Sequence, residues 1–569
     1  MSRREAWLTA LAVFAVALAV RVAAASQIAF PRPEDTAYYV GVARNLVEGR
    51  GLVSDALWSY ATPPLVFPRP AFEVWLPLPS LLAAVPLALS GARAPIPLET
   101  AMRAAQVVST SLGSLLAVLA WRLGADVAAE RGLATGRART LAVGAGLTTA
   151  LYLPLVLHSA LPDSTILFGV LALAAILLVN RVLGDACGPR VTDRRLWAAG
   201  LLLGLAALTR NEAAWLALAL VIPVWRLPGA SRAARGRLTG VLAIASLAVF
   251  VPWAIRDWAV FGSPLPGQAA SNALSVTGFD IFAWHDMPTL SRYLDQGPAA
   301  LIGMRLDGLG HNLVNVLLLF GIPVSAIGLV ALPWQARDHV LRPLLLLSLF
   351  TFFVTSLVFP VATTWGTFLH ASAPVHVLLI VATLGALDAL LAAIGRRLGW
   401  TRPVAWLGPL LSVSASALFC VALLPSFGTG SADTARLYRV LATQLAAAGM
   451  PLDPASPTIT DFPIWLAETA RTTTLALPDE QPADVLDLAS HFGARSIVFA
   501  GQDHGRWPAI LGLQFGAGDP ALACFEEVRL PVPADADDAA AIEDVSVFRI
   551  TCSGVADNPA GTPDDRASP

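Results

Sequence analysis

The chain has 569 residues, of which 56% are hydrophobic and only 14% are charged. A soluble globular protein rarely reaches such values, and long apolar runs of this kind indicate transmembrane helices. The formal net charge is −2, all 38 basic residues are arginines, and the four cysteines show no close pairing that would indicate a zinc or redox motif.

Charge is distributed unevenly along the chain. Residues 426–569 contain 8 arginines and 20 acidic residues, a net charge of −12, whereas the preceding part contains 30 arginines and 20 acidic residues, a net charge of +10. An apolar basic part followed by an acidic polar part predicts two regions on different sides of a membrane.

The first apolar segment, residues 6–28, follows Arg3 and Arg4 and ends in small residues. A cleaved signal peptide has this pattern too. Because many more apolar segments follow, an uncleaved first transmembrane helix is the preferred interpretation.

Apolar windows separated by arginine-rich loops predict eleven transmembrane helices. The arginines then fall in five successive loops on one side, which the positive-inside rule assigns to the cytoplasm. We therefore expect a mainly α-helical, multi-pass protein of the cell inner or plasma membrane, with a cytoplasmic N-terminus. The expected spans are 6–28, 101–122, 141–158, 164–183, 196–210, 212–227, 238–258, 309–332, 343–361, 367–394 and 404–425.

The apolar segment 71–91 is not counted as a span. If it crossed the membrane, every later loop would change sides and the arginine clusters would face outward. It also contains Pro77, Pro79 and Pro86, which disfavour a continuous helix. We expect a hairpin or interfacial helix within a large first external loop, residues 29–100.

Residues 31–52, "PRPEDTAYYVGVARNLVEGRGL", place two carboxylates at the predicted membrane boundary. Asp35 is positioned to act as the N-cap of a helix that ends before Gly49, a favourable C′ residue. Capping does not account for Glu34. Polar groups that face a cavity at the membrane boundary are often functional, and a helix N-terminus would hold a general base in a fixed position.

This stretch, followed by "PPLVFPRPAFEVWLPLPSLLAAVPLALSG", resembles the first external loop of GT-C glycosyltransferases, polytopic enzymes related to protein O-mannosyltransferases and aminoarabinose transferases. Their pattern is an acidic residue, often Asp-Glu, a Tyr about one helical turn on, an Ala-rich helix, a Gly and a Pro-rich segment at the membrane edge. Asp35 and Tyr39 take the Asp and Tyr positions, whereas Thr36 stands where Glu is common and Glu34 lies on the other side. The resemblance is clear for residues 30–90 and weaker up to residue 425.

The resemblance implies an inverting transfer of a hexosyl or pentosyl group from a polyprenyl-phosphate carrier to an extracytoplasmic protein, lipid or glycan acceptor. Asp35 would be the general base, Glu34 an auxiliary, and Tyr39 a substrate contact. Membrane lipid is a further expected partner, and nucleic acid is not. Because the leaving group is a lipid phosphate, cations or a metal should lie near it.

"LHSALPDSTILF" places Asp163 at the external junction of two predicted spans. An Asp before Ser-Thr suits a helix N-cap. The family commonly has an acidic residue in this loop, which implies a site residue that holds acceptor, phosphate or metal. The cofactor stays unknown, with a divalent cation such as Mg or Mn bound by Asp35 and Asp163 as one option.

"LAALTRNEAAWL" interrupts an apolar run with Arg210, Asn211 and Glu212, which must reach the outer interface or a cavity. A tight external turn with an Arg–Glu pair is one interpretation. The other is a substrate site in which Arg210 binds the carrier phosphate, because a planar guanidinium suits phosphate and the family has a basic residue after a Leu-Thr pair.

Three further candidates have structural alternatives. Arg256 is a phosphate ligand or, with Asp257, part of an interfacial charge pair in an aromatic belt. His370 supplies positive charge near the start of its span or is a core histidine. Arg69 and Glu73 shape the donor entrance or anchor the hairpin.

The last third differs from the rest. Alternating strands and amphipathic helices predict a small extracytoplasmic α/β domain over residues 429–553, after a membrane domain over 1–428. Cys524 and Cys552 are either bridged or two buried thiols. Residues 554–569 form an acidic, disordered tail by composition.

Two other function classes share some of these features. A secondary transporter also has many spans and a few intramembrane charges, but the sequence has no internal repeat and carries a large acidic region after the last span. A non-catalytic scaffold of the cell envelope is the third possibility. The first loop and its carboxylates favour the transferase.

Overall fold

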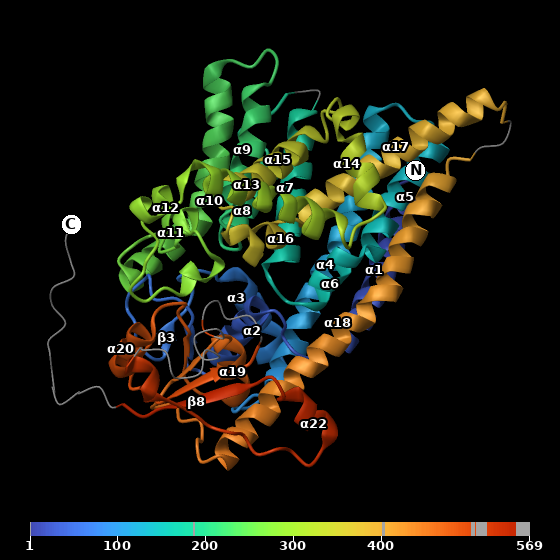
Figure 1. The fold of residues 1–569 in the computed structure, drawn as a ribbon. Helices are drawn as coiled ribbons and strands as arrows, with labels where there is room; N and C mark the ends of the chain where they lie inside the picture. Colours follow the sequence, from blue (N-terminus) through green and yellow to red (C-terminus); the bar gives the residue numbers. More distant parts are fainter. Residues whose placement is uncertain (1, 186–187, 401–403, 502–506, 508–519, 553–569) are drawn as a thin grey trace. The chain divides into compact units, whose positions relative to one another are not determined.

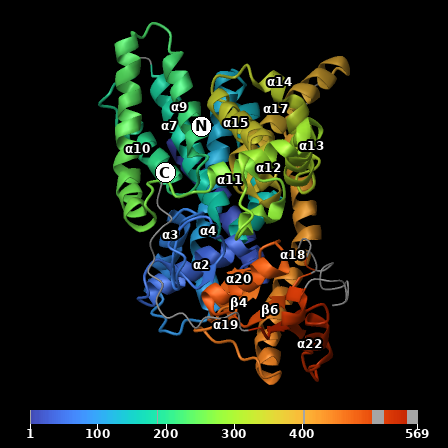
Figure 2. The ribbon, with the colours of Figure 1, turned by 60° about the vertical axis from the view of Figure 1, so that its left-hand side comes forward.

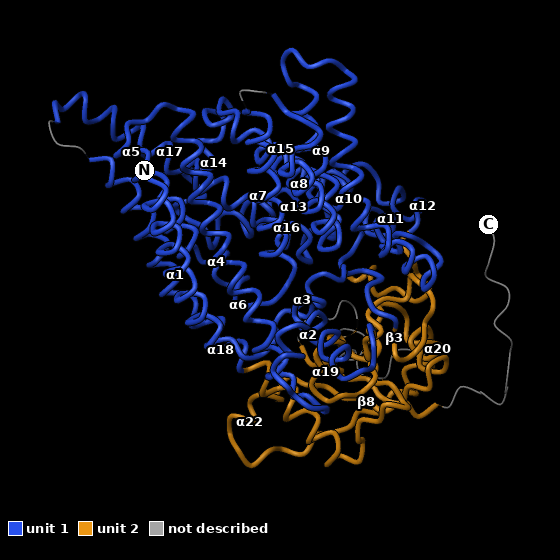
Figure 3. The backbone as a smooth tube through the Cα atoms, turned by 180° about the vertical axis from the view of Figure 1, so that it is seen from behind, with its two compact units in different colours: residues 1–52, 70–278, 289–432 blue, residues 53–69, 279–288, 433–569 orange. Residues whose placement is uncertain are grey.

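The computed structural model describes residues 2–185, 188–400, 404–501, 507 and 520–552. The predicted tail, residues 554–569, lies outside the described residues. The chain forms two compact units, shown in different colours in Figure 3. Unit 1 comprises residues 1–52, 70–278 and 289–432, and unit 2 comprises residues 53–69, 279–288 and 433–569.

Unit 1 is a helical bundle (Figure 1). Within the described part of the chain, six helices are long and apolar enough to cross a membrane, and the bent pair α5 (Thr135–Leu151) and α6 (Leu153–Ala160) would make a seventh. The six are α1 (Arg3–Gln27), α4 (Leu98–Glu130), α7 (Ser164–Leu183), α10 (Arg232–Phe261), α17 (Ala373–Arg397) and α18 (Leu407–Ala447).

The remaining predicted spans correspond to shorter helices, so the count of eleven stays a prediction. These helices are α8 (Arg194–Ala207), α9 (Ala213–Trp225), α14 (Val324–Gln335) and α15 (Arg342–Leu357). The expected continuous span 309–332 is instead divided among α13 (Gly297–His311), a π-helical turn η2 (Asn312–Leu318) and α14. Pro323, at the N-cap of α14, explains the division because proline cannot donate a helical hydrogen bond.

Small residues let neighbouring helices of unit 1 approach closely. Helix α8 packs against α7 and α10, which stand side by side with α9 in Figure 2. A Cβ atom at Gly200 would lie 2.6 Å from that of Ala245, and one at Gly204 would lie 2.6 Å from the carbonyl oxygen of Ser246. Such close packing of small residues is the usual basis of helix association in membranes.

The predicted first loop contains helix α2 (Glu34–Val47). Its N-cap is Pro33, with no side-chain cap hydrogen bond, so the expectation that Asp35 caps this helix was wrong: Asp35 lies inside the first turn. The helix begins earlier than expected because acidic residues suit its first turn, which contains Glu34 and Asp35. Gly49, with φ of 83°, follows the C-cap as predicted.

The excluded apolar segment contains a short helix, α3 (Leu78–Leu89). Its 12 residues extend only about 18 Å, less than the hydrocarbon thickness of a bilayer. The length of α3 therefore agrees with the expectation that this segment does not form a separate span.

Unit 2 contains a six-stranded sheet in the order β2-β5-β4-β6-β8-β7. The first four strands in this order are parallel neighbours, and β8 is antiparallel to both β6 and β7. The strands are β2 (Ala56–Leu57), β4 (Thr458–Thr460), β5 (Thr474–Ala476), β6 (Ser496–Phe499), β7 (Phe525–Glu527) and β8 (Ser546–Ile550), and the helices are α19 (Pro463–Ala470), α20 (Pro482–Phe492) and α22 (Ala536–Ala541). The α/β character predicted for this region is present.

Two segments from far earlier in the chain complete unit 2. Strand β2 pairs with β5, with Ala56 opposite Thr474. The segment Phe279–Pro288 is bound through Glu480, whose carboxylate accepts hydrogen bonds from the backbone amides of residues 284–286 at 2.7–3.1 Å. We call residues 279–288 the strap.

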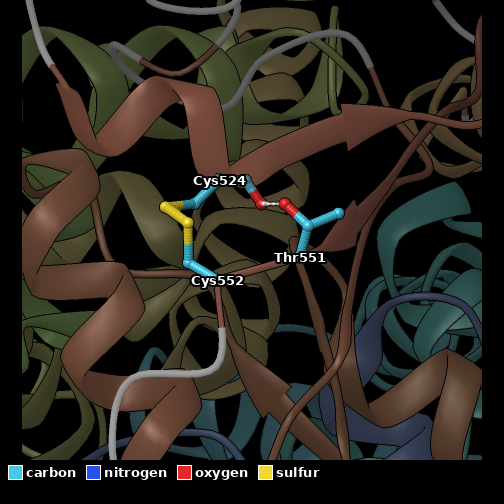
Figure 4. The surroundings of a disulfide bond; sticks show 3 residues. All are labelled: Cys524, Thr551 and Cys552. Carbon is cyan, nitrogen blue, oxygen red and sulfur yellow. Dashed lines mark hydrogen bonds between the residues drawn. A yellow bond between two sulfur atoms is a disulfide. The ribbon is translucent and has the colours of Figure 1, made fainter.

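Cys524 and Cys552 form a disulfide (Figure 4). The two residues flank the paired strands β7 and β8, and the Thr551 amide donates to the carbonyl oxygen of Cys524 at 2.8 Å. Of the two alternatives that the sequence left open, the bridged form is the one in the structure.

Candidate functional site

Four titratable side chains from separate elements meet in unit 1. Asp35 stands in the first turn of α2, His158 in the last turn of α6, Asp163 at the N-cap of α7, and His370 in the short helix α16 (Thr367–Ala371). We call these residues the carboxylate–histidine cluster.

His370 lies between the two carboxylates. Its Nε2 atom is 3.0 Å from Asp35 Oδ2, and its Nδ1 atom is 3.2 Å from Asp163 Oδ2. The same oxygen of Asp163 lies 2.8 Å from Nδ1 of His158. The other oxygen, Oδ1, accepts the backbone amide of Thr165 at 2.8 Å, which is the predicted N-cap bond. The N-cap role of Asp163 is therefore confirmed, and its carboxylate also binds two histidines.

Exposure separates Asp35 from the rest of the cluster. The Asp35 side chain is 24% exposed, whereas those of Asp163, His370 and His158 are 0%, 5% and 7% exposed. Asp35 is thus the member of the cluster that a molecule arriving from outside can reach.

The cluster fixes the charge of its members. Burial acts to raise the pKa of Asp35, but the charge and hydrogen bond of His370 outweigh it and hold that pKa below its usual value. The pKa of Asp163 is lowered in the same way by His158 and His370. Burial disfavours protonated His370, yet the two carboxylates raise its pKa to about 10. At neutral pH an imidazolium therefore lies between two carboxylates.

Arg210 forms a second polar group beside the cluster. Its guanidinium binds both carboxylate oxygens of Glu212 at 2.9 and 3.0 Å and donates to Ser164 Oγ at 2.9 Å and the Thr367 carbonyl oxygen at 3.0 Å. The hydroxyl of Tyr39 also interacts with Ser164. The Arg–Glu pair anticipated from the sequence is present, and it shares Ser164 with a predicted substrate residue.

The structure places the other sequence candidates elsewhere. Glu34 is the half-buried first residue of α2. Arg256 pairs with Asp257 at 2.9 Å, and its guanidinium lies 4.8 Å from the ring centre of Trp253. Arg69 belongs to unit 2, where its guanidinium donates to the Thr62 carbonyl oxygen at 2.6 Å.

His158 and Ser164 were missed by sequence reasoning. Both lie in "LHSALPDSTILF", on either side of the break between α6 and α7. The signal that could have found them is a His and an Asp separated by a proline-containing turn, which brings the two side chains back together. No local pattern indicated that Ser164 would meet Arg210.

The donor set of the cluster could hold a metal ion. Ligating atoms of His158, Asp163 and His370 all lie within 4.8 Å of one another. Two imidazoles and a carboxylate suit Zn²⁺ better than Mg²⁺, which prefers oxygen ligands. Asp35, an expected ligand, bonds to His370 but is not one of these three.

Comparisons with known proteins identify the fold. No protein-family model and no curated protein matches the sequence. Among solved structures, the Archaeoglobus fulgidus oligosaccharyltransferase in complex with Zn and sulfate matches with a TM-score of 0.54 at 14% identity, covering 91% of this chain and 71% of that one. ArnT from Cupriavidus metallidurans bound to undecaprenyl phosphate matches with a TM-score of 0.52 at 15% identity, covering 95% and 98%.

A third match is AglB from Archaeoglobus fulgidus in complex with an inhibitory peptide and a dolichol-phosphate, with a TM-score of 0.52 at 14% identity, covering 88% of this chain and 70% of that one. The matched proteins are membrane glycosyltransferases with the GT-C fold. The chain described here shares that fold, as the resemblance of its first loop implied.

Proposed function

We propose that this chain, which has the GT-C fold, transfers a sugar from a polyprenyl-phosphate donor to an extracytoplasmic acceptor with inversion, and that Asp35 is the general base. The observation that carries the proposal is the carboxylate–histidine cluster, in which the accessible carboxylate of Asp35 is held by His370, and His370 is held in turn by Asp163. A general base must be fixed and must also reach the acceptor.

The proposed chemistry is a single displacement. Asp35 accepts the proton of an acceptor hydroxyl as its oxygen forms a bond to the anomeric carbon. The bond from that carbon to the phosphate oxygen breaks on the opposite face, and the lipid phosphate leaves with the electron pair. The configuration at the anomeric carbon is therefore inverted.

His370 keeps the base ionised. Because the imidazolium lowers the pKa of Asp35, the carboxylate is a weak base that is fully charged at neutral pH. Such a group takes up the proton late, when the attacking oxygen has already become acidic through bond formation. Glu34, beside it on α2, has an auxiliary role in this scheme.

The leaving phosphate requires positive charge. Arg256 is the better of the two predicted phosphate ligands, because it is bound to one carboxylate oxygen of Asp257 and is partly exposed. Arg210 is bound to both oxygens of Glu212 and is more deeply buried, so we assign it to positioning Ser164 and Tyr39 instead. A divalent cation held by His158, Asp163 and His370 would replace the proton on the ligating nitrogen of His370 and would supply the positive charge in its place when bound.

The donor class rests on the fold and on the neighbours that share it, two of which were solved with a dolichol-phosphate or undecaprenyl phosphate. The disulfide of unit 2 supports an extracytoplasmic location for that unit, since disulfides persist in oxidising compartments. The acceptor class, whether protein, lipid or glycan, stays open within this proposal.

Lipid analysis of a deletion strain tests the function whichever sugar is transferred. Loss of the gene should cause one polyprenyl-phosphate sugar to accumulate, and the wild-type gene should remove it. The Asp35→Asn variant should be expressed normally but should not remove the accumulated lipid-linked sugar, because loss of a general base typically lowers the reaction rate roughly 10²–10⁴-fold. Glu34→Gln should restore partial activity.

Glu99→Gln is the matched control, since Glu99 is an exposed carboxylate at the start of another helix of unit 1. It should behave as wild type. Full activity in Asp35→Asn would refute the base assignment alone, whereas a deletion strain with an unchanged lipid-linked sugar pool would refute the transferase.

A further inference from the structure

The helix pair that supplies His158 is broken in a specific way. Helices α5 and α6 meet at Tyr152 with a bend of 51°. Pro154 stands four residues after Ala150 and has no amide hydrogen, so the Ala150 carbonyl lacks its usual helical donor. An unsatisfied carbonyl inside a membrane protein is costly, so another donor must serve it.

Arg21 of α1 provides that donor. Its side chain is completely buried. One terminal nitrogen lies 3.0 Å from the Ala150 carbonyl oxygen, the other lies 3.2 Å from that of Thr149, and Nε lies 3.0 Å from Ser159 Oγ. A single guanidinium thus joins the end of α5 to α6 across the bend.

This contact reaches the residue next to a member of the cluster. Ser159 directly follows His158. The carbonyl oxygen of Ser159 also accepts a hydrogen bond from Ser109 Oγ of α4 at 2.8 Å. Ser159 is therefore fixed through its side chain and its backbone. His158, one residue before this restraint, lies 2.8 Å from Asp163 through its Nδ1 atom.

We propose that Arg21 is a positioning residue that locks the α5–α6 bend and thereby orients His158 toward Asp163. The proposal rests on the proposed function, because it assigns a role in the same site. The guanidinium suits this role because it presents several donors in one plane, whereas a lysine ammonium is a point charge that cannot span the same three acceptors.

Gly113 of α4 allows the contact to be tested without changing Arg21. A Cβ atom at Gly113 would lie 2.1 Å from Ser159 Oγ and 2.5 Å from Arg21 Nε, so Gly113→Ala must displace this pair. Gly240→Ala is the matched control, because Gly240 also lies inside a helix, α10, and a Cβ atom there would have no neighbouring atom within 4 Å. Both substitutions remove a flexible glycine from a helix and should favour helix formation equally.

The measurement is nitrogen NMR of full-length protein labelled at its eight histidines, in detergent at one fixed pH. Signals of His158 and His370 are assigned from their Gln variants. Gly113→Ala, Ser159→Ala and Arg21→Lys should shift the His158 signal, whereas His285 and His491 in unit 2 should not move and Gly240→Ala should resemble wild type. Unchanged His158 signals in folded Gly113→Ala or Ser159→Ala protein would overturn the proposal.

Activity gives a second, separate result. The same variants in the deletion strain should lose roughly 100-fold in transfer, the scale of a displacement of about 1 Å in a reacting group. If Gly113→Ala does not fold, Ser159→Ala, which removes only the two hydrogen bonds of one hydroxyl, carries the same expectation. If the variants shift the histidine signals but deletion of the gene leaves the lipid-linked sugars unchanged, the proposed function is refuted and the positioning role is retained.

Discussion

His370 is the residue on which the site depends most. It bonds to Asp35, 335 positions earlier in the chain, and to Asp163, so that one imidazolium neutralises parts of two carboxylates. Breaking such a buried group of charges is costly because it leaves an uncompensated charge behind. Removal of a single member of the cluster should therefore destabilise the fold.

The stability contributed by His370 should depend on pH. The pKa of His370 is raised from 6.5 to about 10, so its contribution is fully present below about pH 6.5 and is lost as the pH rises through 10. We expect the melting temperature of the wild type to exceed that of His370→Gln by several degrees at pH 6, and the difference to shrink toward pH 10. Thermal unfolding in detergent across this range measures it.

His376→Gln is the control, since His376 is a buried histidine whose ring nitrogen Nδ1 lies 3.2 Å from the Tyr152 hydroxyl. Its difference from wild type should not fall between pH 6.5 and 10. A constant difference for His370→Gln over the same range would mean that His370 is not protonated in the folded protein.

Three of the four cluster residues could be identified from the sequence, but their arrangement could not. Asp35 was identified from its motif, and Asp163 and His370 were weighed against structural roles. Their meeting depends on contacts between elements more than a hundred residues apart, which no local pattern records. The expected cap at Asp35 failed because a Pro-Glu-Asp sequence can begin a helix one or two residues earlier.

Among the elements, α7 combines two tasks at its N-cap residue. Asp163 caps the helix through Thr165 and holds two histidines with its other oxygen. Asp193 caps α8 in the same way, accepting the Arg195 amide at 2.8 Å, but it lies near the surface and its carboxylate pairs with the Arg195 guanidinium instead of histidines. A comparison of Asp163 with Asp193 therefore distinguishes the effect of helix capping from the effect of charge in the site.

The substitutions Asp163→Asn and Asp193→Asn should have unequal effects. Asparagine caps a helix as well as aspartate does, so both helices should keep their ends. Asp163→Asn should nevertheless abolish complementation of the deletion strain and lower the melting temperature, because His158 and His370 lose their shared carboxylate. Asp193→Asn should leave both measurements nearly unchanged, since surface ion pairs contribute little.

Equal losses in the two variants would show that capping, not charge, explains the importance of Asp163. Full activity in Asp163→Asn would remove this residue from the site.

The elements with strong periodicity were predicted well. Strands and helices alternate in residues 458–499 of unit 2, as the α/β pattern of this region predicted. The continuous span 309–332 was predicted wrongly, because the hydropathy window is insensitive to the interruption at Gly321 and Pro323. Helix α18 also extends well beyond the span expected at 404–425, although Pro425, Gly428 and Gly430 lie inside it.

At the scale of the whole molecule, the chain leaves unit 1 and returns to it twice before it enters unit 2 for the last time. The strap is held by Glu480, which is only 4% exposed, and by Trp284, whose ring packs against Tyr60 and Phe492. Unit 2 therefore fixes a segment that belongs, by sequence, to a long loop between α10 and α13.

Glu480→Ala should release the strap. Hydrogen bonds to a charged group contribute roughly 1.5–3 kcal/mol each, and Glu480 accepts them from three consecutive amides. We expect faster tryptic cleavage after Arg292, the first arginine beyond the strap, in an otherwise folded protein. Mass spectrometry of a digestion time course measures the rate.

Glu526→Ala is the control, because Glu526 is an exposed carboxylate on β7 of the same unit. It should be digested like the wild type. Equal rates for Glu480→Ala and wild type would mean that the aromatic contacts and the bonds of Trp284 and His285 to Asp487 hold the strap without Glu480.

This organisation could not be anticipated from the sequence. Strand β2 has only two residues, and a strap recognised through its backbone amides has no side-chain signature. The charge difference between the two parts of the chain indicated two regions, but it could not show that loops of one contribute to the other.

The pairing of β2 with β5 also determines when this part of the sheet can form during biosynthesis. Ala56 and its partner Thr474 are 418 positions apart, the difference between 474 and 56. At typical translation rates of roughly 5–20 residues per second, the synthesis of β5 follows that of β2 by about 20 to 80 s. During this interval β2 has no partner strand. Residues 53–69 are thus among the first to be synthesised and the last to be enclosed, so a chain that stops before β5 leaves an unpaired strand exposed to proteases and to other unfinished chains.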